Sequence, residues 1–307
     1  MAFTAQDVKD LREKTGVGMM DCKKALTEAD GDMDKAIDLL REKGLAAAAK
    51  KAARIAAEGM VYAVVDEAKK VGVVVEVNAE TDFVAKNADF QSFVKDVATV
   101  IIDKNPSDVE ALMALSFDGK QSVADALRDK ILVIGENLSI RRFARYEGDC
   151  VAYIHGGGRI GVLVHFEADG AASGSDILKE CGKDVAMQIA ALNAAYLDQS
   201  SVPAEALEKE KEILIAQIKN DPKNASKPEN ILQKMVEGRI GKFYENNCLL
   251  QQAYVKNGDI TVEQYVVDMA KQTGGSMRVV DFVRFEKGEG LQKREDNFAE
   301  EVASMMQ

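Results

Sequence analysis

The chain has 307 residues, of which 47% are hydrophobic and 30% are charged, so the sequence predicts an ordered globular protein of two or more domains. Its 40 basic and 51 acidic residues give a net charge of -11, which opposes binding to phosphate backbones and predicts no nucleic-acid partner. The first residues lack the apolar core of a signal peptide, and no apolar run is long enough for a bilayer. We therefore expect a cytoplasmic protein without membrane contact. Four widely separated cysteines are typical of structural thiols in a reducing compartment.

Residues 1–55 are predicted to form a domain of short helices followed by a connector. Thr4 can cap the first helix and Asp32 the third, and Gly44 is expected to end the third. The connector is the alanine-rich, basic stretch 46–57, which has high helix propensity but few large apolar residues. We therefore expect a three-helix module joined to the rest of the chain by a helical segment.

A hairpin pattern occurs twice, and this repeat predicts the fold of the central part of the chain. Each copy begins with Glu-Gly and contains two runs rich in β-branched residues, followed by helical segments and a third strand, IRRFARYE in the first copy and VVDFVRFE in the second. The pattern predicts an α+β fold with a duplicated core, in which each unit has a three-stranded antiparallel sheet with helices on one face. We expect the first unit at residues 56–146 and the second at residues 147–197 and 258–286.

The second unit carries an insertion, residues 198–257, that the first unit lacks. Amphipathic helical patterns at 203–219 and 228–245 are joined by a polar link, which predicts a helical hairpin that projects from the body. The apolar stripes of this hairpin need a cover. They can pack on each other, on the core, or on a second copy of the chain, so a homodimer through the hairpin is one possible assembly.

Several motifs suggest chemistry but lack the partners that the chemistry requires. The glycine pattern from Gly156 to Gly161 fits G-x-G-x-x-G, but a strand follows it, so we interpret it as a hairpin turn. His155 with the glycines mimics an esterase oxyanion loop, yet the chain has no G-x-S-x-G. The acidic residues from Asp30 to Asp34 resemble a calcium loop whose glycine is misplaced. With two histidines and no cysteine-histidine group, we predict no catalytic residue, no metal site and no cofactor.

The segment TDFVAKN, residues 81–87, follows the apolar run 71–77, so a strand ends in an acidic residue and a large aromatic. In an arbitrary protein, Phe83 would be a core aromatic and Asp82 a turn former, with Asp89 capping the next helix. The alternative is that the strand is a rigid platform that holds Asp82 and Phe83, together called the wedge, for action on another protein.

Six blocks along the chain resemble bacterial elongation factor Ts in the same order. They are TGVGMMDCKKAL, EVNAETDFVAKN, GENLSIRR, GRIGVLV, KMVEGR and FVRFEKGEG, and they extend from residue 15 to residue 290. Members of this family are guanine nucleotide exchange factors for the translation GTPase elongation factor Tu. The resemblance implies a role in translation elongation, without an enzymatic reaction, and elongation factor Tu as the partner in its GDP-bound and nucleotide-free states.

The resemblance also implies roles for particular residues. In the family, the segment that matches Thr81, Asp82, Phe83 and Val84 intrudes near the magnesium and phosphate site of the GTPase, so this segment is expected to displace magnesium. His155 matches a histidine that contacts another domain of the GTPase. The turn after His155 carries three glycines and is one residue longer than the usual form of the family.

The two ends of the chain have implied roles as well. Residues 1–55 resemble a ubiquitin-associated-like domain that docks on the nucleotide-binding domain of the GTPase, and residues 287–307 match a C-terminal module that touches the same domain. Two competing classes remain open from the residues alone, namely an interaction or chaperone-like module that binds many clients, and an enzyme.

Overall fold

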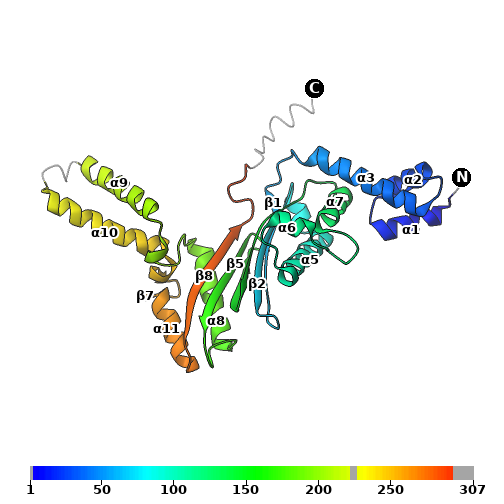
Figure 1. Ribbon diagram of the computed structural model, residues 1–307. Helices are drawn as coiled ribbons and strands as arrows, with labels where there is room; N and C mark the ends of the chain where they lie inside the picture. The colour runs from blue at the N-terminus through cyan, green and yellow to red at the C-terminus, as the bar shows by residue number, and fades with distance from the viewer. Residues whose placement is uncertain (1–2, 222–226, 293–307) are drawn as a thin grey trace.

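Helices build the amino-terminal end of the computed structural model, which describes residues 3–221 and 227–292 (Figure 1). They are α1 (Ala5–Thr15), α2 (Met19–Glu28) and α3 (Met33–Lys51). The predicted caps are confirmed, because the side chains of Thr4 and Asp32 accept hydrogen bonds from backbone amides in the first turns of α1 and α3. Leu11, Leu26 and Leu40 form the core that the helices share.

The expectation that Gly44 ends the third helix is wrong. Gly44 is buried within α3, where a Cβ atom would lie 3.7 Å from Cδ2 of Leu132 in α7 (Val123–Ile134). Gly44 therefore lies in the contact between α3 and α7, where a Cβ atom would make ordinary van der Waals contact, and the alanine-rich residues that follow have high helix propensity. The helix therefore continues to Lys51, and only the first part of the predicted connector is helical.

The first sheet has the antiparallel strand order β1-β2-β3. Its strands are β1 (Glu58–Asp66), β2 (Val71–Ala79) and β3 (Ser139–Glu147). Between β2 and β3 the chain forms α4 (Asp82–Ala85), α5 (Ala88–Lys104), α6 (Val109–Ala114) and α7. The central strand β2 is buried along its whole length, and Phe90 and Phe93 of α5 lie in the core beside it. Asn87 caps α5 by accepting the amides of Asp89 and Phe90, so the predicted cap at Asp89 is wrong by two residues.

The second sheet has the antiparallel order β4-β5-β8. Its strands are β4 (Asp149–His155), β5 (Ile160–Ala168) and β8 (Met277–Glu286). Helices α8 (Asp176–Leu192) and α11 (Val262–Thr273) pack against this sheet, and the short strands β6 (Ala253–Tyr254) and β7 (Asn257–Thr261) precede α11. The order of strands and the position of the helices therefore agree with the expected antiparallel sheets.

The face of each sheet that carries no helix packs against the other sheet. Val61, Ala63, Val74 and Leu163 form a buried apolar cluster between them. The result is a layered body of helices, sheet, sheet and helices, as Figure 1 shows for the central part of the chain. This stacking explains why β2 is buried on both faces.

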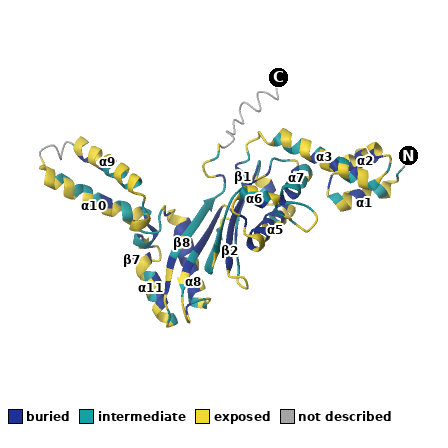
Figure 2. Cartoon of the chain, in the orientation of Figure 1, coloured by how far each residue is buried: buried dark blue, intermediate teal, exposed yellow. Residues whose placement is uncertain are grey.

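The insertion forms α9 (Ala204–Asn220) and α10 (Glu229–Asn247), flanked by the short 3-10 helices η1 (Gln199–Ser201) and η3 (Leu249–Gln251). The two long helices lie side by side and extend away from the body (Figure 1), and much of their surface is exposed (Figure 2). Part of the predicted polar link, residues 222–226, lies outside the described residues. Within the part that the structure describes, no helix combines the length and apolarity needed to cross a membrane.

Candidate partner-binding site

The end of β2 presents the wedge to solvent. The strand ends at Ala79, Thr81 is the N-cap residue of α4, and this one-turn helix begins at Asp82. The Phe83 side chain is 78% exposed, so the alternative that it is a core aromatic is wrong. Val84, by contrast, is buried in the core of the first unit. The turn is therefore anchored by one apolar side chain while the neighbouring aromatic stays free for contact.

A carboxylate from the α7–β3 turn braces the start of the wedge helix. The two oxygens of Glu136 accept hydrogen bonds from the Thr81 amide, at 3.0 Å, and the Thr81 hydroxyl, at 2.7 Å. The Asn137 amide donates to the Glu80 carboxylate at 2.6 Å, and the Asn137 side chain donates to the Arg54 carbonyl at 2.8 Å. These bonds hold the wedge, the α7–β3 turn and the connector from the amino-terminal helices together.

Lys86 neighbours both residues of the wedge. Its ammonium lies 2.8 Å from Oδ2 of Asp82 and 5.8 Å from the centre of the Phe83 ring. The hydrogen bond from Lys86 lowers the pKa of Asp82 below its usual value, with a smaller contribution from the charge of Lys287. Asp82 is thus a carboxylate at neutral pH, and it stands beside an exposed aromatic ring that a partner could cover.

His155 is the last residue of β4 and is exposed. Its Nδ1 atom lies 3.1 Å from the Tyr153 hydroxyl. The three glycines that follow all have positive φ, and β5 begins directly after Arg159. This confirms the interpretation of the glycine pattern as a hairpin turn, because a strand follows where a dinucleotide fold needs a helix.

The wedge and His155 lie at the same end of the layered body. Glu58 at the start of β1 pairs with Ala79 at the end of β2, which places the wedge beside the start of β1. The Val61 amide donates to the Gly158 carbonyl at 2.8 Å, which places the His155 turn beside the same strand. Residues that are far apart in sequence are therefore presented on one end of the molecule.

The opposite end of the sheets holds a cleft of ≈ 610 Å³, lined by residues that include Lys70, Cys150 and Lys183. Burial raises the pKa of the Cys150 thiol to about 11, so the thiol is protonated and unreactive at neutral pH. Over residues 3–221 and 227–292, His, Cys, Asp and Glu side chains form no group that could hold a metal ion. The wedge end offers contact surface, and the cleft offers no activated nucleophile.

Glu136 and Asn137 are site residues that sequence reasoning missed. Both lie in the block GENLSIRR, which carries the family resemblance, but the pattern gives no role to either residue. Their role depends on the α7–β3 turn lying beside the end of β2, which is a tertiary contact. Of the predicted C-terminal module, residues 293–307 lie outside the described part of the chain.

Comparison with known proteins gives a consistent result over the whole chain. The family model described as elongation factor TS matches residues 80–289. Proteins named elongation factor Ts from Clostridium perfringens (strain SM101 / Type A) and Clostridioides difficile (strain 630) are 52% and 51% identical to this chain over 306 residues, which is 99% of each chain. The protein of the same name from Clostridium kluyveri is 50% identical over 310 residues, again 99% of each chain. Because these relatives match nearly the whole chain at about 50% identity, the chain belongs to the elongation factor Ts family.

Proposed function

We propose that this chain is a guanine nucleotide exchange factor for elongation factor Tu, and that it acts in the cytoplasm during translation elongation. The observation that carries the proposal is the wedge. Phe83 is 78% exposed at the end of a fully buried strand, and Glu136 braces the helix on which it stands. An exposed aromatic on a rigid platform is typical of a residue that inserts into a partner.

The wedge acts on the magnesium and phosphate site of the GTPase. In P-loop GTPases the nucleotide phosphates are held by magnesium and by backbone amides, so moving either of them weakens nucleotide binding. Burying a Phe side chain removes about 150 to 250 Å² from water, which is worth about 4 to 6 kcal/mol at about 25 cal/mol per Å². Since about 1.4 kcal/mol corresponds to a factor of ten, this is enough, before the entropy cost of association, to offset a loosening of GDP by about two to three orders of magnitude.

Asp82 contributes charge to the same step. The carboxylate is exposed and ionised, so it can compete with the ligands of magnesium or repel the phosphates of GDP. Binding of the factor and binding of nucleotide are then thermodynamically linked, so incoming GTP weakens the complex by the same coupling free energy. The factor performs no chemical reaction of its own.

His155 is proposed as the second contact with elongation factor Tu. It is exposed, and it lies at the same end of the body as the wedge. The similar strand orders β1-β2-β3 and β4-β5-β8 support a duplicated core, in which each unit supplies one contact. The helices of residues 1–55 are proposed to form a ubiquitin-associated-like domain that docks on the nucleotide-binding domain of the GTPase, and residues 287–307 are proposed to touch the same domain.

The α9–α10 hairpin is proposed to bind a second copy of the chain. Leu214 and Ile240 are buried in the hairpin, whereas Ile213, Ile215 and Ile231 are 43%, 38% and 38% exposed. Apolar side chains on a projecting element support an interaction surface. Sedimentation of the isolated chain tests this: a dimer is expected, Ile215→Lys should weaken it, and a monomer at micromolar concentration contradicts it.

Release of a fluorescent GDP analogue from elongation factor Tu, measured while this chain is titrated, tests the proposed function. We expect faster release with increasing concentration of the chain, and no binding of the analogue to the chain alone. Unchanged release would exclude exchange activity. Tight binding of GDP by the isolated chain would favour a nucleotide-binding enzyme instead.

A further inference from the structure

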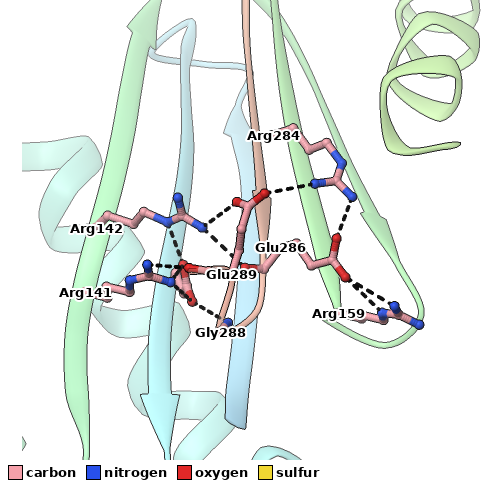
Figure 3. A network of polar contacts seen from close by, with 8 residues as sticks. Arg141, Arg142, Arg159, Arg284, Glu286, Gly288 and Glu289 are labelled. Carbon is pink, nitrogen blue, oxygen red and sulfur yellow. Dashed lines mark hydrogen bonds and ion pairs between the residues drawn. The ribbon is translucent and has the colours of Figure 1, made fainter. Parts of the chain in front are cut away.

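A chain of polar contacts connects the strand that carries the wedge with the turn that carries His155 (Figure 3). It begins at Glu76 in the middle of β2, whose side chain is 0% exposed. The Glu76 carboxylate accepts the Gly288 amide at 2.8 Å, the Arg141 guanidinium at 3.1 Å and the Arg142 guanidinium at 2.6 Å. Burial opposes ionisation of Glu76, but hydrogen bonds from the Gly288 amide, the Asn78 side chain and Arg142 outweigh it and lower the pKa. The buried Glu76 carboxylate therefore binds the segment that follows β8.

The arginines of β3 continue the chain of contacts to this segment. Arg142 donates to the Glu286 carbonyl at 3.3 Å and pairs with the Glu289 carboxylate at 3.2 Å, while its guanidinium lies 4.2 Å from the centre of the Phe285 ring. Arg141 donates to the Glu289 carbonyl at 2.5 Å. Arginines of the first sheet therefore bind the end of β8, which belongs to the second sheet, and the residues that follow it.

The chain of contacts ends at the His155 turn. The Glu286 carboxylate accepts Arg159 at 3.2 Å and Arg284 at 2.7 Å. The Lys287 amide donates to the Arg159 carbonyl at 2.9 Å. Residues 286–289, together with Glu76, Arg141, Arg142 and Arg159, are called the joint from here on.

Gly288 fits the joint only because it lacks a side chain. Its φ is +68°, and a Cβ atom there would lie 2.1 Å from the carbonyl oxygen of Ala57. Gly290 has nearly the same φ, +73°, but its Cβ would meet only the tip of Arg141 at 3.9 Å. An alanine at either position introduces the same kind of backbone strain, because both have positive φ. Only at Gly288 does the added methyl group also clash with the Ala57 carbonyl, so that this segment must move away from its place in the joint.

We propose that Glu76 is a positioning residue for nucleotide exchange, which fixes the wedge and the His155 turn relative to each other through the joint. The inference rests on the proposed function and concerns how the same end of the molecule works. Two contacts on one rigid body engage a partner together, because the second contact forms without further ordering of the chain. If the joint opens, each contact must be ordered separately, and the partner is bound less tightly.

Hydrogen exchange of the isolated chain tests the joint without the partner. In Gly288→Ala, the amides of Val61 and Lys287 should exchange about ten times faster than in the natural chain, because both are bonded to the Gly158–Arg159 turn. Glu76→Gln should have the same effect, since it removes the charge that holds Gly288 and the arginines. Gly290→Ala is the matched control and should leave both amides protected. Equal protection in Gly288→Ala and Gly290→Ala would overturn the proposal.

A double-mutant cycle on GDP release tests the functional half. In the natural chain, the effect of the Phe83→Ala/His155→Ala double variant on the rate of GDP release should differ by about threefold or more from the product of the two single effects. The reason is that a rigid joint couples the two contacts. In the Gly288→Ala and Glu76→Gln backgrounds, the two substitutions should be additive to within about twofold. Thermal unfolding confirms that each variant is folded. The same coupling in all backgrounds would overturn the role of Glu76.

The two arms separate failure of this inference from failure of the proposed function. If the natural chain does not accelerate GDP release at all, the exchange function is wrong, and hydrogen exchange still decides whether the joint exists. If release is accelerated but the coupling persists without the joint, only the positioning role of Glu76 is wrong.

Discussion

A Cβ atom placed on Gly161 would lie 2.4 Å from Cγ1 of Val61, which is fully buried between the two sheets. The second sheet therefore touches the first at a position without a side chain. Because the two sheets carry the wedge and His155 at one end, the close approach at Gly161 helps to set how these two residues are presented.

Gly161→Ala should destabilise the chain by about 1 to 3 kcal/mol, because the added methyl group must push the sheets apart. Gly238→Ala in α10 is a suitable control, since nothing lies within 4 Å of the position of its Cβ. That change should stabilise the chain by up to about 1 kcal/mol through helix propensity. Urea unfolding measures both, and equal effects of the two substitutions would contradict the tight contact between the sheets.

Phe83→Ala should slow stimulated GDP release at least about tenfold while leaving the free energy of unfolding nearly unchanged, because the ring is 78% exposed. The matched variant is Phe90→Ala in the neighbouring helix α5. Phe90 is fully buried, so its truncation should cost about 3 to 5 kcal/mol. An unaltered rate of GDP release in Phe83→Ala would exclude the wedge.

Thr81→Val should lower exchange activity, because it leaves one oxygen of Glu136 without the hydroxyl that donates to it at 2.7 Å. The cost of the lost bond is about 1 kcal/mol, and the wedge helix becomes less well fixed. Thr81→Ser keeps the hydroxyl and should retain most of the activity. The measurement is GDP release at saturating factor, and equal activity of the serine and valine variants would argue against bracing by Glu136.

Acidification should weaken the joint in a defined direction. Burial opposes ionisation of Glu76, but its hydrogen bonds lower the pKa below the ordinary value of 4.5. A depressed pKa in the folded state means that Glu76 adds stability at pH values above 4.5, and that this stability is lost as the pH falls through the lowered pKa. Melting temperatures of the natural chain and of Glu76→Gln should therefore converge below that pH. A constant difference from neutral to acidic pH would be inconsistent with an ionised Glu76.

Asp184→Asn should destabilise the second unit by about 1 to 3 kcal/mol, because it removes the charge of a carboxylate that is only 10% exposed and accepts three hydrogen bonds, although its partner Lys256 is 55% exposed and screened by solvent. The Asp184 carboxylate accepts the hydroxyls of Tyr254 and Tyr265 at 2.7 and 2.9 Å and the ammonium of Lys256 at 2.6 Å. The control is Asp268→Asn, whose side chain is 46% exposed and whose substitution should leave the stability nearly unchanged. Chemical unfolding measures the free energy of unfolding of both variants. A similar loss of stability in Asp184→Asn and Asp268→Asn would contradict a structural role of Asp184.

Local features of the chain were predicted well where the sequence pattern is itself the cause of the structure. Runs rich in β-branched residues form strands of both sheets, and Thr4 and Asp32 cap helices because their side-chain oxygens accept hydrogen bonds from nearby backbone amides. Two local predictions failed for different reasons. Gly44 packs near Leu132 within α3 instead of ending the helix. The cap of α5 is Asn87 and not Asp89, because Asn87 directly precedes the first residue of the helix.

The sequence by itself determined the family, the antiparallel strands and the segment that contains the wedge, because these depend on residue order and short-range periodicity. Only the tertiary structure decided that Phe83 is exposed, that Glu136 braces Thr81, and that the buried Glu76 holds Gly288. Thr81 and Glu136, and likewise Glu76 and Gly288, are far apart in sequence, and each pair meets only when the sheets and helices have packed together. A hydrogen bond of this kind leaves no periodic trace in the sequence, because its partners are brought together only after the core has formed.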